Sequence, residues 1–127
     1  MTILVVDDSR IMRSLIKNLF TDLDIGHCEY VEAENGEEAF KLVQHRPIDL
    51  VFLDWNMPKM LGIDFLKQIR SIPKFKQLPI IMITSEISKA NVIEALKHGA
   101  TDYIIKPIDE KNFREKIGKI LRNMLKT

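Results

Sequence analysis

Several side chains able to do chemistry follow short apolar runs in this chain. They comprise three carboxylates, an amide, two hydroxyls and an ammonium, namely Asp7, Asp8, Asp54, Asn56, Thr84, Ser85 and Lys106. Asp7 and Asp8 directly follow the run Ile3–Val6, and Asp54 directly follows Leu50–Leu53. Taken singly, an aspartate after a strand is often only a turn residue, and a threonine there is often only a strand former. Their meaning therefore depends on whether the fold brings these positions together.

The runs that carry these residues alternate with longer amphipathic stretches. We expect strands at Ile3–Val6, Tyr30–Ala33, Leu50–Leu53, Ile80–Ile83 and Tyr103–Ile105, and helices at Arg10–Leu23, Gly36–His45, Gly62–Ser71, Lys89–Lys97 and Asp109–Leu125. Apolar stripes typical of core-facing helix sides recur at Ile11, Leu15, Leu19 and Leu23 in the first helix and at Phe113, Ile117, Ile120, Leu121 and Met124 in the last. Ser9 and Ser88 are expected N-caps, and Gly99 is the expected left-handed residue after the fourth helix.

Five strand–helix repeats predict an α/β fold with a parallel sheet covered on both faces. We expect the flavodoxin-like, doubly wound arrangement, with five helices and five parallel strands in the order 2-1-3-4-5. In that order the first and third strands are neighbours, and their carboxyl ends open on one crevice. The 127 residues fit one domain, spanning 1–127.

Charge and cysteine content exclude some classes of function. Nineteen basic against eighteen acidic residues give a net charge of +1, which does not favour nucleic acid or an anionic membrane surface. The single cysteine, Cys28, cannot form an internal disulfide, which favours a reducing compartment. The N-terminal residues have neither a basic n-region nor a long apolar segment. We therefore expect a cytoplasmic protein without membrane insertion.

Three carboxylates in one crevice would repel one another and raise one another's pKa unless a cation compensated them. A hard divalent cation with oxygen ligands does so, and Mg²⁺ is the common choice. Lys106 could pair with a carboxylate or with a phosphoryl oxygen, and the hydroxyl of Thr84 could donate to the same group. This set is the one expected for phosphoryl transfer, with Asp54 as the nucleophile that forms an acyl phosphate.

The sequence closely resembles the receiver domains of bacterial response regulators, especially single-domain chemotaxis regulators. The motifs that carry the resemblance are Leu4-Val5-Val6-Asp7-Asp8-Ser9, Asp54-Trp55-Asn56-Met57-Pro58, Thr84-Ser85-Glu86 and Lys106-Pro107. The resemblance implies that Asp54 accepts the phosphoryl group. It also implies that Mg²⁺ is bound by Asp8, Asp54 and the backbone carbonyl of Asn56, with Asp7 acting directly or through water.

The same resemblance assigns roles to other positions. Thr84 and Tyr103 match the switch pair of the family, in which the hydroxyl moves toward the phosphoryl group and the ring follows inward. Lys106 matches the family's site lysine, and the Lys106–Pro107 bond is expected to be cis. Asn56 and Glu86 match the positions that tune self-dephosphorylation, so a short-lived phosphoryl state is expected.

The family further implies a phosphorylation-activated switch of a two-component system rather than an enzyme. Its own activities would be self-phosphorylation from small phosphodonors and autodephosphorylation. The expected donor is a sensor histidine kinase, of the chemotaxis type, and the protein is expected to be a monomer. The expected target is a protein such as a flagellar switch protein, bound at the face of the fourth helix, fifth strand and fifth helix. The basic residues of the last helix are either simply solvated or form a rim that steers an acidic partner.

Other interpretations stay open at this point. A stand-alone receiver could act as a phosphate sink or an adaptor in another pathway. An aspartate-nucleophile phosphatase of the dehalogenase type would need an acid where Asn56 stands, and an amide cannot protonate a leaving group. A flavin-binding protein of this fold would need a phosphate-cradling loop where Asp7 and Asp8 stand. A pseudo-receiver that never uses phosphate would not need the full set of chemical residues.

Overall fold

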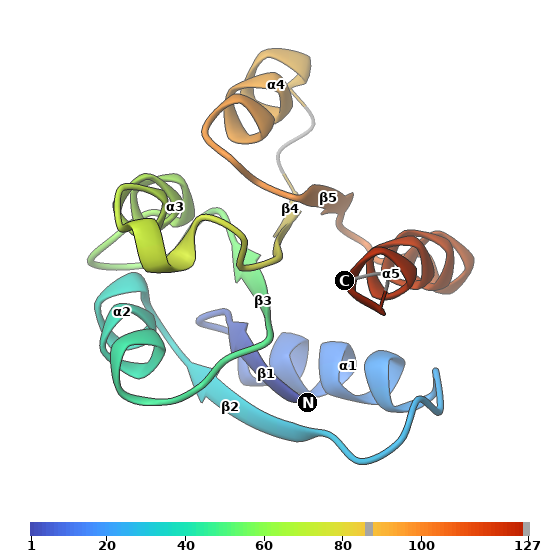
Figure 1. The fold of residues 1–127 in the computed structure, drawn as a ribbon. Coiled ribbons are helices and arrows are strands. Elements are labelled where there is room, and N and C mark those ends of the chain that lie inside the picture. Colours follow the sequence, from blue (N-terminus) through green and yellow to red (C-terminus); the bar gives the residue numbers. More distant parts are fainter. Residues whose placement is uncertain (86–87, 126–127) are drawn as a thin grey trace.

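A five-stranded parallel sheet forms the centre of the protein, with the strand order β2-β1-β3-β4-β5 (Figure 1). The computed structural model describes residues 1–85 and 88–125, with only the backbone at Leu125. The strands are β1 Thr2–Val6, β2 Glu29–Ala33, β3 Leu50–Asp54, β4 Ile80–Thr84 and β5 Asp102–Ile105. The helices are α1 Arg10–Thr21, α2 Gly36–His45, α3 Gly62–Arg70, α4 Lys89–Lys97 and α5 Glu110–Leu125, with a short 3₁₀ helix η1 at Pro73–Phe75. The predicted fold and strand order are confirmed; η1 was not predicted.

Helices α1 and α5 cover one face of the sheet, and aromatic rings join them to its central strand. Phe20 of α1 meets Phe52 of β3 edge to face, with ring centroids 6.0 Å apart. Phe52 in turn stacks on Phe113 of α5 at 5.7 Å. All three rings are fully buried. Such pairs add to the free energy of simple burial, so this face of the molecule is firmly packed.

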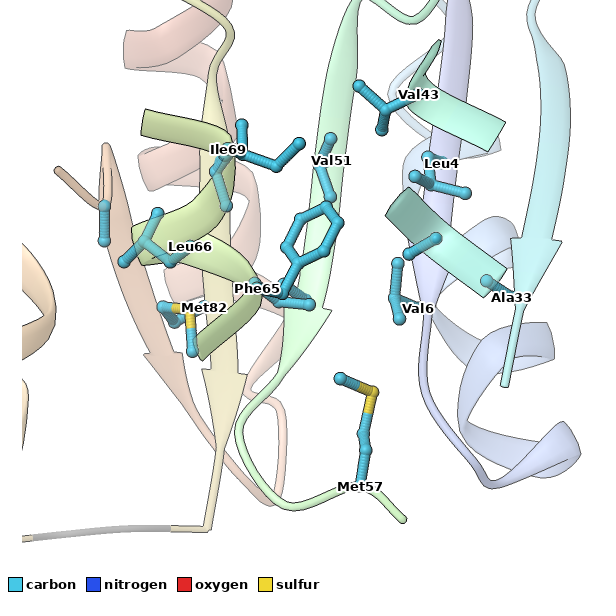
Figure 2. Packing of buried hydrophobic residues seen from close by; sticks show 14 of the residues in the cluster. Leu4, Val6, Ala33, Val43, Val51, Met57, Phe65, Leu66, Ile69 and Met82 are labelled. Atoms are coloured by element: carbon cyan, nitrogen blue, oxygen red, sulfur yellow. The ribbon is translucent and has the colours of Figure 1, made fainter. Parts of the chain in front are cut away.

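The other face is covered by α2, α3 and α4 (Figure 1). Figure 2 shows Phe65 and Leu66 of α3 above Val51 and Met82 of the sheet, all of them fully buried. Met57, in the loop that follows β3, reaches the same apolar cluster and is 7% exposed. The core therefore holds the loop next to the end of the central strand.

The apolar stripe expected to bury α1 is wrong in its first half. Ile11 is 83% exposed and Leu15 is 40% exposed, whereas Arg13, Ile16 and Phe20 are the buried residues of the helix. Ile16 and Phe20 form a second stripe of the same spacing, and the sheet selects that one. The stripe predicted for α5 is confirmed, with Phe113, Ile117, Ile120 and Leu121 buried and Met124 packed against them.

Local signals at helix ends agree with the structure in the places that matter for the site. The hydroxyl of Ser9 accepts a hydrogen bond of 3.2 Å from the backbone N–H of Met12, so the predicted N-cap of α1 is confirmed. Ser88 occupies the N-cap position of α4. Gly99 follows α4 with φ of 105°, as expected, and the Lys106–Pro107 peptide bond is cis. No helix in the described part of the chain is long and apolar enough to cross a membrane.

Candidate functional site

Three carboxylates meet at the carboxyl ends of β1 and β3. Asp7, Asp8 and Asp54 each place a carboxylate oxygen within 4.8 Å of the other two. Asp7 and Asp54 are buried, at 1% and 5% exposure, and Asp8 is exposed to solvent. They meet because β1 and β3 are neighbours in the sheet, with Val6 paired to Leu53. The predicted gathering of the three acids is therefore present.

Lys106 supplies the positive charge of this cluster. Its ammonium lies 3.2 Å from Oδ2 of Asp7 and 3.2 Å from Oδ1 of Asp54. The backbone N–H of Lys106 donates to the carbonyl of Thr84 at 2.8 Å, which fixes the residue beside the end of β4. One ammonium thus serves two buried carboxylates.

The charges in the cluster alter one another's titration. Burial, and next the neighbouring Asp7 carboxylate, raise the pKa of Asp54 to about 6 even though Lys106 opposes the rise. Burial disfavours the charge on Lys106, but the Asp54 and Asp7 carboxylates outweigh it and raise the pKa of the ammonium. At neutral pH the site therefore holds more negative than positive charge. A hard divalent cation such as Mg²⁺ fits this donor set, because all available ligands are oxygens.

The loop after β3 approaches the backbone of Asp54 closely. A Cβ atom at Gly62 would lie 2.1 Å from the carbonyl oxygen of Asp54, so no residue larger than glycine fits without a shift of the backbone. The N–H of Gly62 donates to the carbonyl of Trp55 at 2.8 Å. Between these contacts, Lys59 has φ of 69°, which is uncommon for a residue with a side chain. Asn56 lies exposed in this loop, immediately beyond the acid cluster.

Thr84 and Tyr103 lie on the neighbouring strands. Thr84 ends β4, is 2% exposed, and follows Ile83, which pairs with Asp54 across the sheet. Tyr103 is half-buried in the edge strand β5. The ammonium of Lys116, in α5, lies 3.9 Å from the centroid of the Tyr103 ring and also donates to the Tyr103 carbonyl. A cation over a tyrosine ring stabilises that ring position.

Of the predicted site residues, Asp7, Asp8, Asp54, Lys106 and Thr84 come together at this edge of the sheet, with Asn56 in the adjoining loop. Tyr103 lies nearer the amino end of β5, where it pairs with Met82, and Glu86 lies outside the described residues. Sequence reasoning missed Arg13, which is buried and contacts the backbone of Asp7. The available signal was the pair Glu32 and Glu34, which flank the buried Ala33 at the end of β2. Two acids in these positions favour a basic side chain on the neighbouring helix α1.

A comparison with protein families agrees with this geometry. The family of the response regulator receiver domain matches residues 3–118. The chain belongs to this family, whose members are signalling regulators of two-component systems.

Several similar proteins within the family are chemotaxis proteins. The CheY homolog of Campylobacter jejuni is 44% identical over 95% of this chain and 92% of its own length. The chemotaxis protein CheY1 of Helicobacter pylori (strain ATCC 700392 / 26695) is 47% identical over 95% of this chain and 97% of its own length. The high-resolution structure of the chemotaxis response regulator CheY4 of Vibrio cholerae superposes with a TM-score of 0.82 at 30% identity, covering 94% of this chain and 97% of that one. The chain is thus a receiver domain of the CheY type.

Proposed function

We propose that Asp54 is the phosphoacceptor of a chemotaxis switch and that a sensor histidine kinase is its phosphoryl donor. The observation that carries this proposal is the position of Asp54. It is a buried carboxylate with two further carboxylates and a shared ammonium within reach. With its pKa raised to about 6, Asp54 is ionised at neutral pH, as a nucleophile must be. The cytoplasmic location expected from the sequence belongs to the same proposal.

The carboxylates of Asp7, Asp8 and Asp54, with the backbone carbonyl of Asn56, are the groups that would hold Mg²⁺. When bound there, the ion would offset the excess negative charge and provide a coordination position for a phosphoryl oxygen. Within this set the exposed Asp8 faces solvent and can admit the ion, whereas Asp7 and Asp54 are fixed by burial and by Lys106.

In the transfer step, a carboxylate oxygen of Asp54 forms a bond to phosphorus as the bond between phosphorus and the donor breaks. With a phosphohistidine donor the departing imidazole takes a proton from solvent; with acetyl phosphate the leaving group is acetate. Lys106 would turn from Asp54 toward the phosphoryl oxygens, since the acyl phosphate no longer presents a free carboxylate. The hydroxyl of Thr84 would donate to the same oxygens from the adjacent strand. Asn56, with Glu86, would hold the water that later hydrolyses the acyl phosphate.

Thr84 and Tyr103 would transmit the change at Asp54 to the surface that binds the target. Movement of Thr84 toward the phosphoryl group frees space for the ring of Tyr103, and the phosphoryl group shifts the balance between the two ring positions. The face made by α4, β5 and α5 would then bind a protein target, such as a flagellar switch protein. This face presents the exposed apolar side chains of Ile93, Leu96 and Ile105. Lys111, Lys119 and Arg122 of α5 are exposed and would favour an acidic partner segment.

Trp55 gives a direct test, because it follows Asp54 and is half-buried. We expect Mg²⁺ and then acetyl phosphate to change its fluorescence in two steps. The variant Asp54→Asn should lose the second step completely, and mass spectrometry should find the added phosphoryl group on Asp54 in the parent alone. A second step that persists in Asp54→Asn would show that another residue is the nucleophile.

A further inference from the structure

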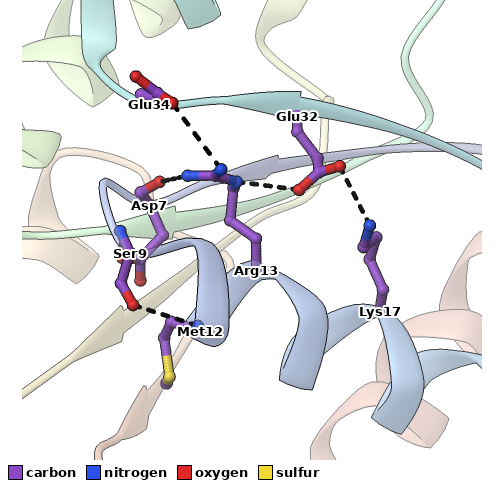
Figure 3. Close-up of polar contacts among 7 residues, drawn as sticks. All are labelled: Asp7, Ser9, Met12, Arg13, Lys17, Glu32 and Glu34. Atoms are coloured by element: carbon purple, nitrogen blue, oxygen red, sulfur yellow. Dashed lines mark hydrogen bonds and ion pairs between the residues drawn. The ribbon is translucent and has the colours of Figure 1, made fainter.

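We propose that Arg13 is a positioning residue for the acidic site, because it fixes the peptide group that joins Asp7 to Asp8. The inference rests on the proposed function, since it concerns how these acids bind a divalent cation. Arg13 lies in α1, and its guanidinium points back toward the end of β1 (Figure 3).

The guanidinium is buried and uses its donors in three directions. Nη1 donates to the backbone carbonyl of Asp7 at 2.7 Å. Nε donates to Oε1 of Glu32 at 2.9 Å, and Nη2 lies 3.9 Å from Oε1 of Glu34. Arg13 is only 7% exposed, so each of these interactions is partly removed from water. A buried arginine needs such partners, and here one partner is the backbone of the site itself.

The bond to Asp7 goes beyond what a tie between α1 and β2 requires. Glu32 of β2 and Glu34, just beyond its end, already supply acceptors for the charge of Arg13, and the contact with the Asp7 carbonyl is the shortest of the three. On its other side, the N–H of Asp7 donates to the carbonyl of Ala33 at 3.1 Å. The backbone of Asp7 is thus held from both directions just beyond the end of β1.

This restraint determines where two carboxylates begin. The side chain of Asp7 is further held by the N–H of Ser9, at 2.9 Å, and by Lys106. Asp8 is exposed, and its Cα is the next one after the peptide group that Arg13 holds. A change in the ψ angle of Asp7 that turned this carbonyl away from Arg13 would also move Asp8 relative to Asp54. Arg13 therefore fixes the position of Asp8, the exposed acid of the cluster, without contacting the cation itself.

The positive charge of Arg13 does not oppose cation binding, because it is neutralised locally. Glu32 binds both Arg13 and Lys17, whose ammonium lies 3.0 Å from Oε2 (Figure 3). Hydrogen bonds from Arg13, and then from Lys17, lower the pKa of Glu32 and keep it ionised. With Glu34 included, the cluster holds two cations and two carboxylates, so the guanidinium can approach the acidic turn without adding net charge and can act through geometry.

The chain provides a matched control at the opposite edge of the sheet. Arg70 is also an arginine that donates to backbone carbonyls, at 2.8 and 3.0 Å to Gly99 and at 2.6 Å to Phe75. Both Arg13→Met and Arg70→Met remove a guanidinium and keep the apolar stem. Only the first removes a contact with the acidic turn.

The experiment measures Mg²⁺ affinity by titration of Trp55 fluorescence, and thermal unfolding in EDTA for each protein. We expect both variants to unfold at a lower temperature than the parent. Arg13→Met should in addition bind Mg²⁺ about tenfold more weakly or worse, as is typical when a group that orients a metal ligand is removed. Arg70→Met should bind Mg²⁺ within about twofold of the parent, well below the loss expected for Arg13→Met. Arg13→Lys should fall between Arg13→Met and the parent, because an ammonium lacks the planar fork of donors with which the guanidinium reaches Asp7 and Glu32 in different directions.

If Arg13→Met and Arg70→Met bind Mg²⁺ equally well, Arg13 is only a tie between α1 and β2, and the inference is overturned while the proposed function stands. Should Arg13→Met fail to fold, Arg13→Lys decides, and parental affinity in that variant overturns the inference. A parent protein whose fluorescence ignores Mg²⁺ would overturn the proposed function and the inference together.

Discussion

The two edges of the sheet use polar residues in opposite ways. At the edge formed by the amino ends of the strands, the amino edge, two polar side chains satisfy backbone groups. Asp49 accepts from the N–H of Thr2 at 2.7 Å, and Thr101 accepts from the N–H of Ile80 at 3.0 Å. At the carboxyl edge Asp7 and Asp54 instead face each other and share the ammonium of Lys106.

This difference indicates that the amino edge stabilises the fold, whereas the carboxyl edge holds the like charges that bind a ligand. Hydrogen bonds between a side chain and an otherwise unpaired backbone group favour the folded state. Like charges held together in a buried place disfavour it unless they are compensated. We therefore expect substitutions at the amino edge to change stability alone, and substitutions at the carboxyl edge to change stability and ligand binding together.

The largest expected effect comes from adding a methyl group at each edge. In Gly62→Ala the new Cβ would meet the backbone carbonyl of Asp54 at 2.1 Å, so α3 or the end of β3 must move. We expect a loss of about 3 kcal/mol in the free energy of unfolding, as for an overpacked core, together with weaker Mg²⁺ binding. Urea unfolding and a Mg²⁺ titration measure the two effects.

Gly99→Ala is the counterpart at the amino edge. Its Cβ would meet the flexible side chain of Arg70 at 2.9 Å, and its φ of 105° is unfavourable for alanine. We expect a smaller loss of about 1–2 kcal/mol from the backbone conformation, with unchanged Mg²⁺ affinity. Equal effects of the two alanines on Mg²⁺ binding would contradict the division between the edges.

The next effect has the opposite sign. Because the pKa of Asp54 is raised from 3.8 to about 6, the folded protein holds the proton of Asp54 more tightly than the unfolded chain does. Asp54 therefore contributes stability below its unfolded pKa and loses that contribution as the pH rises through about 6. In EDTA at pH 7, Asp54→Asn should be more stable than the parent by about 1–2 kcal/mol, less than the full pKa shift because the pair with Lys106 is lost.

Thermal unfolding of Asp54→Asn and the parent from about pH 3 to about pH 8 checks this sign, because that range begins below the ordinary pKa of 3.8 and ends about two units above the raised pKa of about 6. The advantage of the variant should shrink as the pH falls and should disappear once the parent carboxyl is protonated. A parent that is more stable than Asp54→Asn at neutral pH without a divalent cation would mean that Lys106 fully compensates the charges.

The smallest effect concerns a carboxylate at the carboxyl edge that does have its own cations. Hydrogen bonds from Arg13, and then Lys17, lower the pKa of Glu32 from 4.5. Its contribution is present above that value and is lost as the pH falls through the lower, folded pKa. The side chain is 38% exposed, so Glu32→Gln should cost only about 0.5 kcal/mol at pH 7. The difference from the parent should vanish in acid; a difference that instead grows in acid would contradict the pairing.

Much of the fold could be predicted from the sequence because its strands and helices carry different apolar patterns. The runs before Asp7 and Asp54 are apolar throughout, as strands buried on both faces require, and every predicted helix exists. The order of the strands then brought the acids together without any further information. Local pattern and topology were therefore sufficient to predict where the side chains at the strand ends lie.

What the sequence did not predict depends on packing between elements. Helix α1 carries two apolar stripes, and the choice of Ile16 over Ile11 is made by the sheet beneath it. Arg13 could be buried because its stem is apolar and Glu32 lies opposite its guanidinium. The helical period of apolar residues does not indicate such a contact. The approach of Gly62 to Asp54 is likewise a contact between a helix start and a strand end.

Among the nine residues of α4, Ala95 alone is buried, whereas α3 buries five of its nine. Little apolar area would be exposed to water if α4 tilted or frayed, so its opening free energy should be among the lowest of the helices. Amide hydrogen exchange in α4 should accordingly be faster than in α3. A helix so loosely attached at the edge of the sheet can be rearranged by a binding partner at small cost, while the aromatic cluster on the far face stays intact.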